Sequence, residues 1–381
     1  MDNNKKYFNI YVFLTTFARG LLEVFIGSFL YKLGFSLREV IYYYVLVMGF
    51  SIVLAIPCSH MSKKYSNKVL SIIGILAFFL LQIVLNIITK KNIYLYLVAF
   101  LFALYRRAYW IARRYYTLKI IDDKNNISKN YSTISMLNQL GSIVSSYIGA
   151  LFLQYFNVSI INIISFILLG ISTYYLYQIK FEQDKNDIKL NLFETFKCIP
   201  KTSIMHIGCY ELQVVVSYLF PLFIIIYVKD TYTAIGIINV IASVASLIFT
   251  YLYGRLINKE RNYLKLSIIL FLIVKVLQIN STGIILVVAS FIIGFITKMY
   301  EQSFQKEHIL LSKNFEYNNY NYAFETIQNV TRFIVFLLLY LFVRDIKSML
   351  YITLIVISSS LFVSFKTYSL NKNSDVMWKE K

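Results

Sequence analysis

The chain has 381 residues, 58% of them hydrophobic, and a mean hydropathy of +0.62. This composition excludes an ordinary soluble domain, whose apolar share is about 45–50%. The formal net charge of +19 could suggest a nucleic-acid partner. The basic residues, however, lie mostly in short loops between apolar stretches, where they would meet anionic lipid headgroups. We therefore expect a lipid bilayer as the partner, and no nucleic acid.

Twelve long apolar stretches follow one another along the chain. Each has roughly 20 residues or more, enough to cross a hydrocarbon core of about 30 Å. Backbone in lipid must satisfy its own hydrogen bonds, so these stretches are predicted to be helices. The predicted helices are residues 7–32, 36–58, 69–89, 92–118, 131–156, 158–180, 201–228, 232–257, 263–280, 283–303, 317–343 and 346–368. The sequence thus predicts an all-α membrane protein with twelve transmembrane helices.

The distribution of basic residues predicts the orientation. If both termini are inside, the inner segments hold 25 basic residues and the outer loops hold seven. Positive charge concentrates in cytoplasmic loops, so we expect both termini in the cytoplasm. The abundance of Ile, Asn, Lys, Tyr and Phe is typical of a low-GC genome. We therefore expect a multi-pass protein of a bacterial plasma membrane.

Neither the first segment nor the cysteines indicate a secreted protein. The N-terminal stretch carries no small-residue cleavage site and is expected to be a membrane helix rather than a removable signal peptide. Cys58, Cys198 and Cys209 show no CxxC spacing. A disulfide framework is therefore not expected, and neither a bound metal nor a cofactor is indicated. No HExxH, phosphate-loop or nucleophile-elbow motif occurs, so we do not expect an enzyme.

The chain divides into two halves that resemble each other. The longest hydrophilic interruption is 181–200, which predicts an N-terminal six-helix bundle over 1–180, a cytoplasmic linker over 181–200, and a C-terminal six-helix bundle with a short tail over 201–381. A shift of 195 residues overlays 30–44 on 225–239 and 59–64 on 254–259. Internal repeats of this kind are typical of two-bundle transporters.

Two motifs resemble those of the major facilitator superfamily. The loop after the eighth predicted helix reads Gly254-Arg-Leu-Ile-Asn258-Lys259, which matches the family's Gly-x-Leu-x-Asp-Arg/Lys with Asn for Asp. The first-half copy at 59–64 is degenerate. The fifth helix carries small residues over 141–150, in the pattern of the family's exporters but without their proline.

The resemblance implies a fold and a mechanism. It implies two pseudo-symmetric six-helix bundles around a midplane site, with helices 1, 4, 7 and 10 lining the cavity and helix 11 packed behind it. Gly254, Asn258 and Lys259 would form a conformational gating loop. A monomer is expected.

Ionisable side chains inside predicted helices are candidate functional residues, because each costs about 2.5–3.5 kcal/mol to insert. Arg19 and Glu23 lie four residues apart and can pair. They are either a self-neutralised pair that tolerates burial or a gated acid with a substrate-binding cation. Arg106 and Arg107 point about 100° apart on their helix, so at most one faces the cavity squarely. Trp110 could stack on a guanidinium.

The positions of the remaining charged residues along their helices predict their roles. Arg113 and Arg114 are expected to reach the inner headgroups, and Lys275, Lys298 and Glu301 to snorkel to the interfaces. Glu211 is either pore-facing or paired with an arginine across its bundle. Glu325 and Arg332 are seven apart and are expected to form a structural ion pair. The candidate substrate-binding residues are Arg19, Arg106, Arg107, Trp110 and Glu211, and the candidate proton-coupling residues are Glu23 and Glu211.

These assignments favour a secondary active transporter that works by alternating access. Buried acids beside buried arginines favour proton-coupled export, by antiport, of a small organic compound such as a drug, an antibiotic or a peptide-like metabolite. The first alternative is uptake or exchange of an anionic metabolite. The second is a membrane scaffold or immunity protein that retains a transporter fold without transporting.

Overall fold

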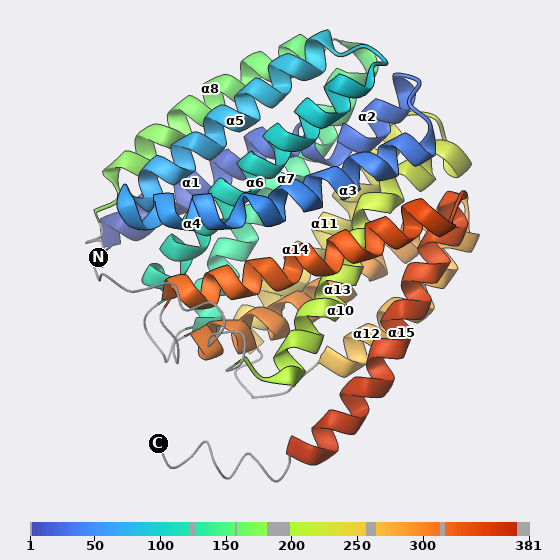
Figure 1. The fold of residues 1–381 in the computed structure, drawn as a ribbon. Coiled ribbons are helices and arrows are strands. Elements are labelled where there is room, and N and C mark those ends of the chain that lie inside the picture. Colours follow the sequence, from blue (N-terminus) through green and yellow to red (C-terminus); the bar gives the residue numbers. More distant parts are fainter. Residues whose placement is uncertain are drawn as a thin grey trace.

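The structure is a computed structural model, and it describes residues 2–121, 127–156, 158–180, 199–256, 264–312 and 317–371 (Figure 1). Within these ranges all regular structure is helical. Helical segments occupy all twelve predicted stretches. Nine of the described helices are long and apolar enough to span a membrane, and the bent pair Leu37–Val53 and Ala55–Ser62 makes a tenth.

The helices of the two halves have the following bounds. The first half contains α1 (Asp2–Gly20), η1 (Glu23–Phe25), α2 (Ile26–Lys32), α3 (Leu37–Val53), α4 (Ala55–Lys64), α5 (Asn67–Ile87), α6 (Asn92–Ile120), α7 (Ile127–Tyr155) and α8 (Val158–Gln178). The second half contains α10 (Lys201–Phe223), η3 (Ile224–Val228), α11 (Tyr232–Leu256), α12 (Leu264–Asn280), α13 (Gly283–Ser312), α14 (Tyr317–Phe342) and α15 (Ile346–Asn371).

Two of the predicted helices are not continuous. The first stops at Gly20 and resumes through η1, where the Leu22 amide donates to the Arg19 carbonyl at 3.2 Å in a tighter turn. The second bends by 44° between α3 and α4. Pro57 explains this bend, because its ring clashes with the carbonyl four residues earlier, at Val53, where α3 ends.

The helices form two bundles that meet along two helix pairs (Figure 1). In the first half, α1 packs on α7 and α8, and α5 packs on α6 and α8. In the second half, α10 packs on α14 and α15, and α13 packs on α11 and α12. The bundles contact each other chiefly where α7 meets α11 and where α3 meets α14. The predicted linker 181–200 lies almost entirely outside the described residues, so the domain boundaries stay a prediction.

The small residues of α7 allow helix backbones to approach closely, as their spacing predicted. A Cβ added at Gly149 would lie 2.2 Å from the carbonyl oxygen of Leu21, in the break of the first helix. On the other side of α7, a Cβ at Gly236 of α11 would lie 2.9 Å from the Ser146 carbonyl oxygen. The fifth helix therefore packs tightly on its own bundle and on the opposite one.

Candidate functional site

A cavity of about 430 Å³ lies between the two bundles. It is the size of many small-molecule sites, which run from about 300 to 1,000 Å³. We call it the central cavity. Helices α1, α6, α10 and α13 all contribute to its wall, as the resemblance implied. Its charged residues are Arg19, Glu23, Arg106, Arg113, Lys298, Glu301 and Arg332.

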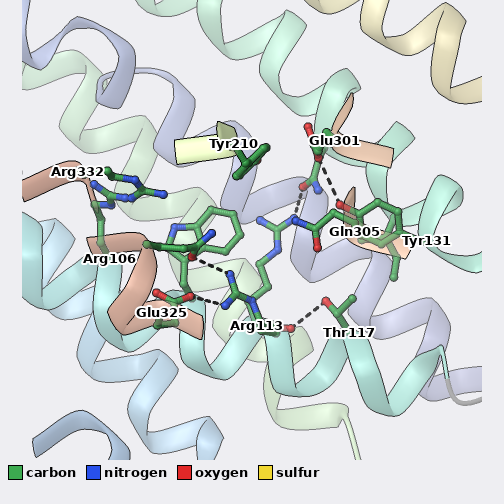
Figure 2. Close-up of a pocket in the computed structure, with 14 residues that line it drawn as sticks. Arg106, Arg113, Thr117, Tyr131, Tyr210, Glu301, Gln305, Glu325 and Arg332 are labelled. Atoms are coloured by element: carbon green, nitrogen blue, oxygen red, sulfur yellow. Dashed lines mark hydrogen bonds and ion pairs between the residues drawn. The ribbon is translucent and has the colours of Figure 1, made fainter. Parts of the chain in front are cut away.

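A second, smaller cavity of about 160 Å³ adjoins the first (Figure 2). It extends toward the predicted cytoplasmic ends of α6, α7, α13 and α14, and we call it the inner cavity. The residues that line both cavities are Arg106, Trp110, Arg113, Asn138, Tyr210, Glu301 and Arg332. These shared side chains therefore lie where the two cavities meet.

Arg19 and Glu23 form the predicted ion pair, with Nε and Oε2 2.9 Å apart. The pair bridges the break in the first helix rather than lying on one continuous helical face. The Arg19 guanidinium also lies 5.1 Å from the Trp110 ring, so the predicted cation–π contact of Trp110 is confirmed. Both charged residues line the central cavity.

Arg106 and Arg107 occupy different environments, as their helical offset predicted. Arg106 lines both cavities, and among the described residues its guanidinium donates a hydrogen bond to the Met48 sulfur, at 3.8 Å. Arg107 is 1% exposed and lines neither cavity. Its guanidinium contacts the Glu325 carboxylate at 3.4 Å. Arg107, a predicted substrate-binding residue, therefore links α6 to α14 instead of facing the cavities.

The expectation that Arg113 and Arg114 reach the headgroups was wrong. Arg113 is 4% exposed, lines both cavities, and donates to the Tyr109 hydroxyl at 2.6 Å and to the Asn138 side chain. Arg114 forms an ion pair with Glu325 at 2.7 Å. Both residues sit where α6 faces the opposite bundle, so their side chains find polar partners inside the protein and do not extend to lipid.

Glu211 is fully buried and does not line either cavity. The Arg332 Nε donates to its carboxylate, and the Gln328 amide donates to it at 2.5 Å. This is the packing alternative for Glu211, a pairing with an arginine in its own bundle. Glu211 thus holds Arg332 from behind, while Arg332 itself lines the wall of both cavities.

The expected ion pair between Glu325 and Arg332 does not form, because each has a nearer partner. Glu325 pairs with Arg107 and Arg114 of the other bundle, and Arg332 pairs with Glu211. Helix α14 therefore does not pack behind the cavities: Arg332 lines both of them, and Glu325 lines the inner one.

The expected snorkelling of three residues was also wrong. Lys298 and Glu301 pair on α13, with Nζ and Oε1 2.8 Å apart, and both line the central cavity. Lys275 is 3% exposed. Its ammonium donates to Gln278 at 2.6 Å and lies 3.5 Å from the Phe220 ring centre. Each lysine finds its partners inside the C-terminal bundle, and none needs the interface.

The predicted gating loop cannot be placed. Gly254 lies near the end of α11, whereas Asn258 and Lys259 lie outside the described residues. No group of three or more His, Cys, Asp or Glu side chains that could hold a metal ion lies within the ranges given above.

The contacts between the bundles differ in chemistry at the two ends of their interface. Toward the predicted outer side, Tyr44 of α3 packs on Tyr218 and Phe336, with ring centres 5.2 and 5.1 Å apart. Toward the inner side, the contacts are polar. Glu325 bridges to α6 through its two arginines, and the Tyr131 hydroxyl of α7 donates to Glu301 at 3.3 Å. The contacts on the outer side are thus mainly aromatic, with one ion pair at the periphery between Lys32 and Asp230 at 3.0 Å, and the contacts on the inner side are ionic.

Comparison with known proteins identifies the family. The sequence profile of the Major Facilitator Superfamily matches residues 8–305, so the chain belongs to this superfamily. No curated protein sequence matches it significantly. The fold class predicted from the sequence, two pseudo-symmetric six-helix bundles, is confirmed.

Solved structures share the fold at low sequence identity. A bacterial homologue of the iron transporter ferroportin, in an outward-facing state, has a TM-score of 0.70 at 10% identity and covers 96% of this chain and 99% of that one. The nucleoside transporter NupG has 0.67 at 12% identity, covering 95% and 99%. The E. coli fucose:proton symporter FucP has 0.67 at 14% identity, covering 94% and 97%. Transport across a membrane is common to all three.

Proposed function

We propose that this protein is a secondary active transporter that moves a small organic anion by alternating access through the central cavity. The observation that carries this proposal is the state of Arg106 and Arg113. Both side chains line the cavity, and neither has a carboxylate partner among the described residues. A guanidinium that is largely removed from water favours an anionic partner.

The balance of charge in the cavity wall supports the same substrate class. Five basic and two acidic side chains line it. Two of the basic ones, Arg19 and Lys298, are paired with the two acids, and Arg332 is paired with Glu211 behind it. The two remaining arginines leave the site with excess positive charge, which attracts anions into the cavity.

The uncharged lining favours a solute with further hydrogen-bonding groups. Hydroxyl and amide side chains line the central cavity on both bundles: Thr16, Asn138, Gln139, Ser142, Ser217 and Asn239. The Asn239 amide nitrogen is buried and has no hydrogen-bond partner among the described residues. Hydroxylated acids or phosphate esters would supply acceptors to such donors.

Tryptophan fluorescence tests this proposal at the site itself. The chain has two tryptophans, Trp110 and Trp378. The Trp378→Phe variant therefore keeps Trp110 as the one fluorescent reporter. The Trp110 ring lies 5.0 Å from the Arg113 guanidinium and 5.1 Å from the Arg19 guanidinium. Glucose, gluconate and glucose 6-phosphate form a series of neutral, singly and doubly charged probes. We expect the two anions to change Trp110 emission and glucose to leave it unchanged; an equal response to glucose would contradict an anion site.

Direction of transport follows from a second measurement. Export of a small organic compound by proton antiport was favoured by the sequence, and uptake or exchange of an anion was its alternative. The excess positive charge in the cavity favours an anionic substrate, which is the substrate class of the uptake or exchange alternative. Flux of gluconate into right-side-out and inverted vesicles, with and without a proton gradient, separates export from uptake.

The scaffold or immunity alternative makes a different prediction. A protein that only retains the fold needs no solute, so no probe in a metabolite panel would raise its melting temperature. A transporter is stabilised by whatever binds its folded state. We expect anionic solutes to raise the melting temperature, and an unchanged value with all of them would favour the scaffold.

A further inference from the structure

The pair Lys298–Glu301 in the cavity wall has a consequence for energy coupling. We propose that Glu301 carries the coupling proton and that its protonation strengthens anion binding, so that anion and proton cross the membrane in the same direction. This inference rests on the anion-transport function proposed above. It differs from the antiport favoured by the sequence, and it assigns coupling to a residue that the sequence did not single out for it.

Glu301 lies where both cavities and both bundles meet. It lines the central and the inner cavity. Its Oε1 accepts a hydrogen bond from the Lys298 ammonium, on the same helix, at 2.8 Å. It also accepts one from the Tyr131 hydroxyl, on α7 of the opposite bundle, at 3.3 Å. Figure 2 shows the contact between Tyr131 and Glu301 at the edge of the inner cavity. Its carboxylate is thus reachable from the cavities and also joins the two bundles.

Competition for Lys298 links the proton to the anion. The ionised Glu301 carboxylate neutralises Lys298, which has no other carboxylate partner among the described residues. When Glu301 takes up a proton, the carboxylate charge disappears and Lys298 becomes a free cation in the cavity wall. A bound anion gains that cation, so protonation favours anion binding. By reciprocity the anion favours protonation to the same extent.

The other charged groups around Glu301 reinforce this sign. Besides Lys298, the titratable side chains that face it are Tyr131 of α7, Tyr210 of α10, Arg113 of α6, and Arg332 and Glu325 of α14. Helix α11 contributes the uncharged Asn239 to the cavity, and Lys275 of α12 is bonded to Gln278 and lines neither cavity. Cations predominate in this set, and while no anion is bound they favour the ionised carboxylate. A bound anion neutralises them and adds negative charge, so it favours the neutral, protonated form of Glu301.

The remaining carboxylates of the site are less suited to coupling. Glu211 lines neither cavity and is held by Arg332. Glu325 is bound by two arginines at once. Glu23 resembles Glu301 in having a cationic partner four residues or fewer away, Arg19, but among the described residues no hydrogen bond joins it to the opposite bundle. Glu301 alone among the four combines cavity exposure, one cationic partner and a contact across the bundles.

The test measures anion affinity against pH in the Trp378→Phe background. The probes are gluconate and inorganic sulfate, which keep constant charge between pH 5.5 and 8.5. Trp110 emission reports binding. We expect the dissociation constant to rise by up to about tenfold per pH unit in part of this range, which is the slope for one linked proton. Glu301→Gln should bind at every pH as tightly as the parent does in acid.

Further variants keep the outcome decisive. Glu301→Asp retains a titratable carboxyl and should retain the slope. Tyr131→Phe removes a donor to the ionised carboxylate and should move the slope to higher pH. Glu39→Gln, outside the cavity at the start of α3, should keep the parental slope.

Three results would overturn the inference while leaving anion transport intact. They are a parent with no pH slope, a Glu301→Gln variant that keeps the slope, and a Glu23→Gln variant that alone loses it. If neither probe changes Trp110 emission at any pH, the proposed function itself fails, and this inference fails with it.

Discussion

The adjacent residues Arg106 and Arg107 show how one position on a helix decides what a charged side chain does. Arg106 faces the cavities without a carboxylate, whereas Arg107 is buried against Glu325. Replacing Arg106 by Gln should weaken gluconate binding about ten- to one-hundredfold, since a charge-assisted hydrogen bond contributes about 1.5–3 kcal/mol. The melting temperature should change little. Trp110 fluorescence and thermal unfolding measure the two effects.

Arg107→Gln is the matched variant with the opposite expectation. It removes one of the two cations bound to Glu325, so it should lower the melting temperature more than it lowers affinity. Arg344→Gln, at an exposed position after α14, controls for loss of any arginine. Equal losses of affinity in Arg106→Gln and Arg107→Gln would contradict the distinction between a binding and a structural arginine.

For individual side chains, the sequence could predict those contacts that depend on spacing within one helix. The 100° offset between Arg106 and Arg107 follows from helical spacing and agrees with their different environments. The pairing of Arg19 with Glu23 was also confirmed, although the helix breaks between the two residues. The partners of Arg113, Lys298 and Glu325 depend on how helices from different bundles meet, which spacing does not specify. A useful signal was nevertheless present: Arg113 is seven residues after Arg106, on the same helical face.

At the scale of helices, close packing around α7 holds the wall of the cavity. Gly149→Ala would place a methyl group 2.2 Å from the Leu21 carbonyl oxygen, so α1 must move away from α7. We expect a loss of about 1–3 kcal/mol, typical of overpacking, and weaker anion binding, because Arg19 and Glu23 flank this break. Thermal unfolding and Trp110 titration measure both.

Gly170→Ala provides the matched control on α8. Nothing lies within 4 Å of a Cβ added there. The substitution should stabilise the protein slightly, by about 0.5–1 kcal/mol, since alanine favours helix more than glycine does. If Gly149→Ala and Gly170→Ala had the same effect, the tight packing of α7 on the broken helix would be disproved.

All twelve predicted stretches are helical. Their positions were predictable because a helix that spans a membrane needs a long run of apolar residues, which is visible in the sequence. Their interruptions were less so. Pro57 accounts for the bend before α4 and could have been recognised in the sequence. The break after Gly20 has no proline. It occurs where α1 packs against Ser145 and Gly149 of α7 and where Arg19 and Glu23 pair, which are contacts between helices distant in the sequence.

For the whole molecule, the ionic contacts on the inner side and the mainly aromatic contacts on the outer side are expected to respond to different changes. Glu325→Gln leaves Arg107 and Arg114 without their shared carboxylate, and removing one partner of a buried pair costs about 3–5 kcal/mol. The inward-open form lets water reach both arginines and avoids this cost. We therefore expect the variant to favour the inward-open form, seen as faster thiol labelling of the cavity from the cytoplasmic side. Glu39→Gln should label at the parental rate, and a slower rate in Glu325→Gln would contradict an ionic inner gate.

Alternating access to the central cavity is tested most directly by a single cysteine at Ser142, which lines it. Cys58, Cys198 and Cys209 are replaced first, and Ile167→Cys on the exposed face of α8 serves as the control. We predict that a membrane-impermeant thiol reagent labels position 142 from either side of the membrane, that gluconate slows the labelling from both, and that position 167 stays unlabelled. Protection of position 142 from both sides, with and without gluconate, would contradict a translocation path through this cavity.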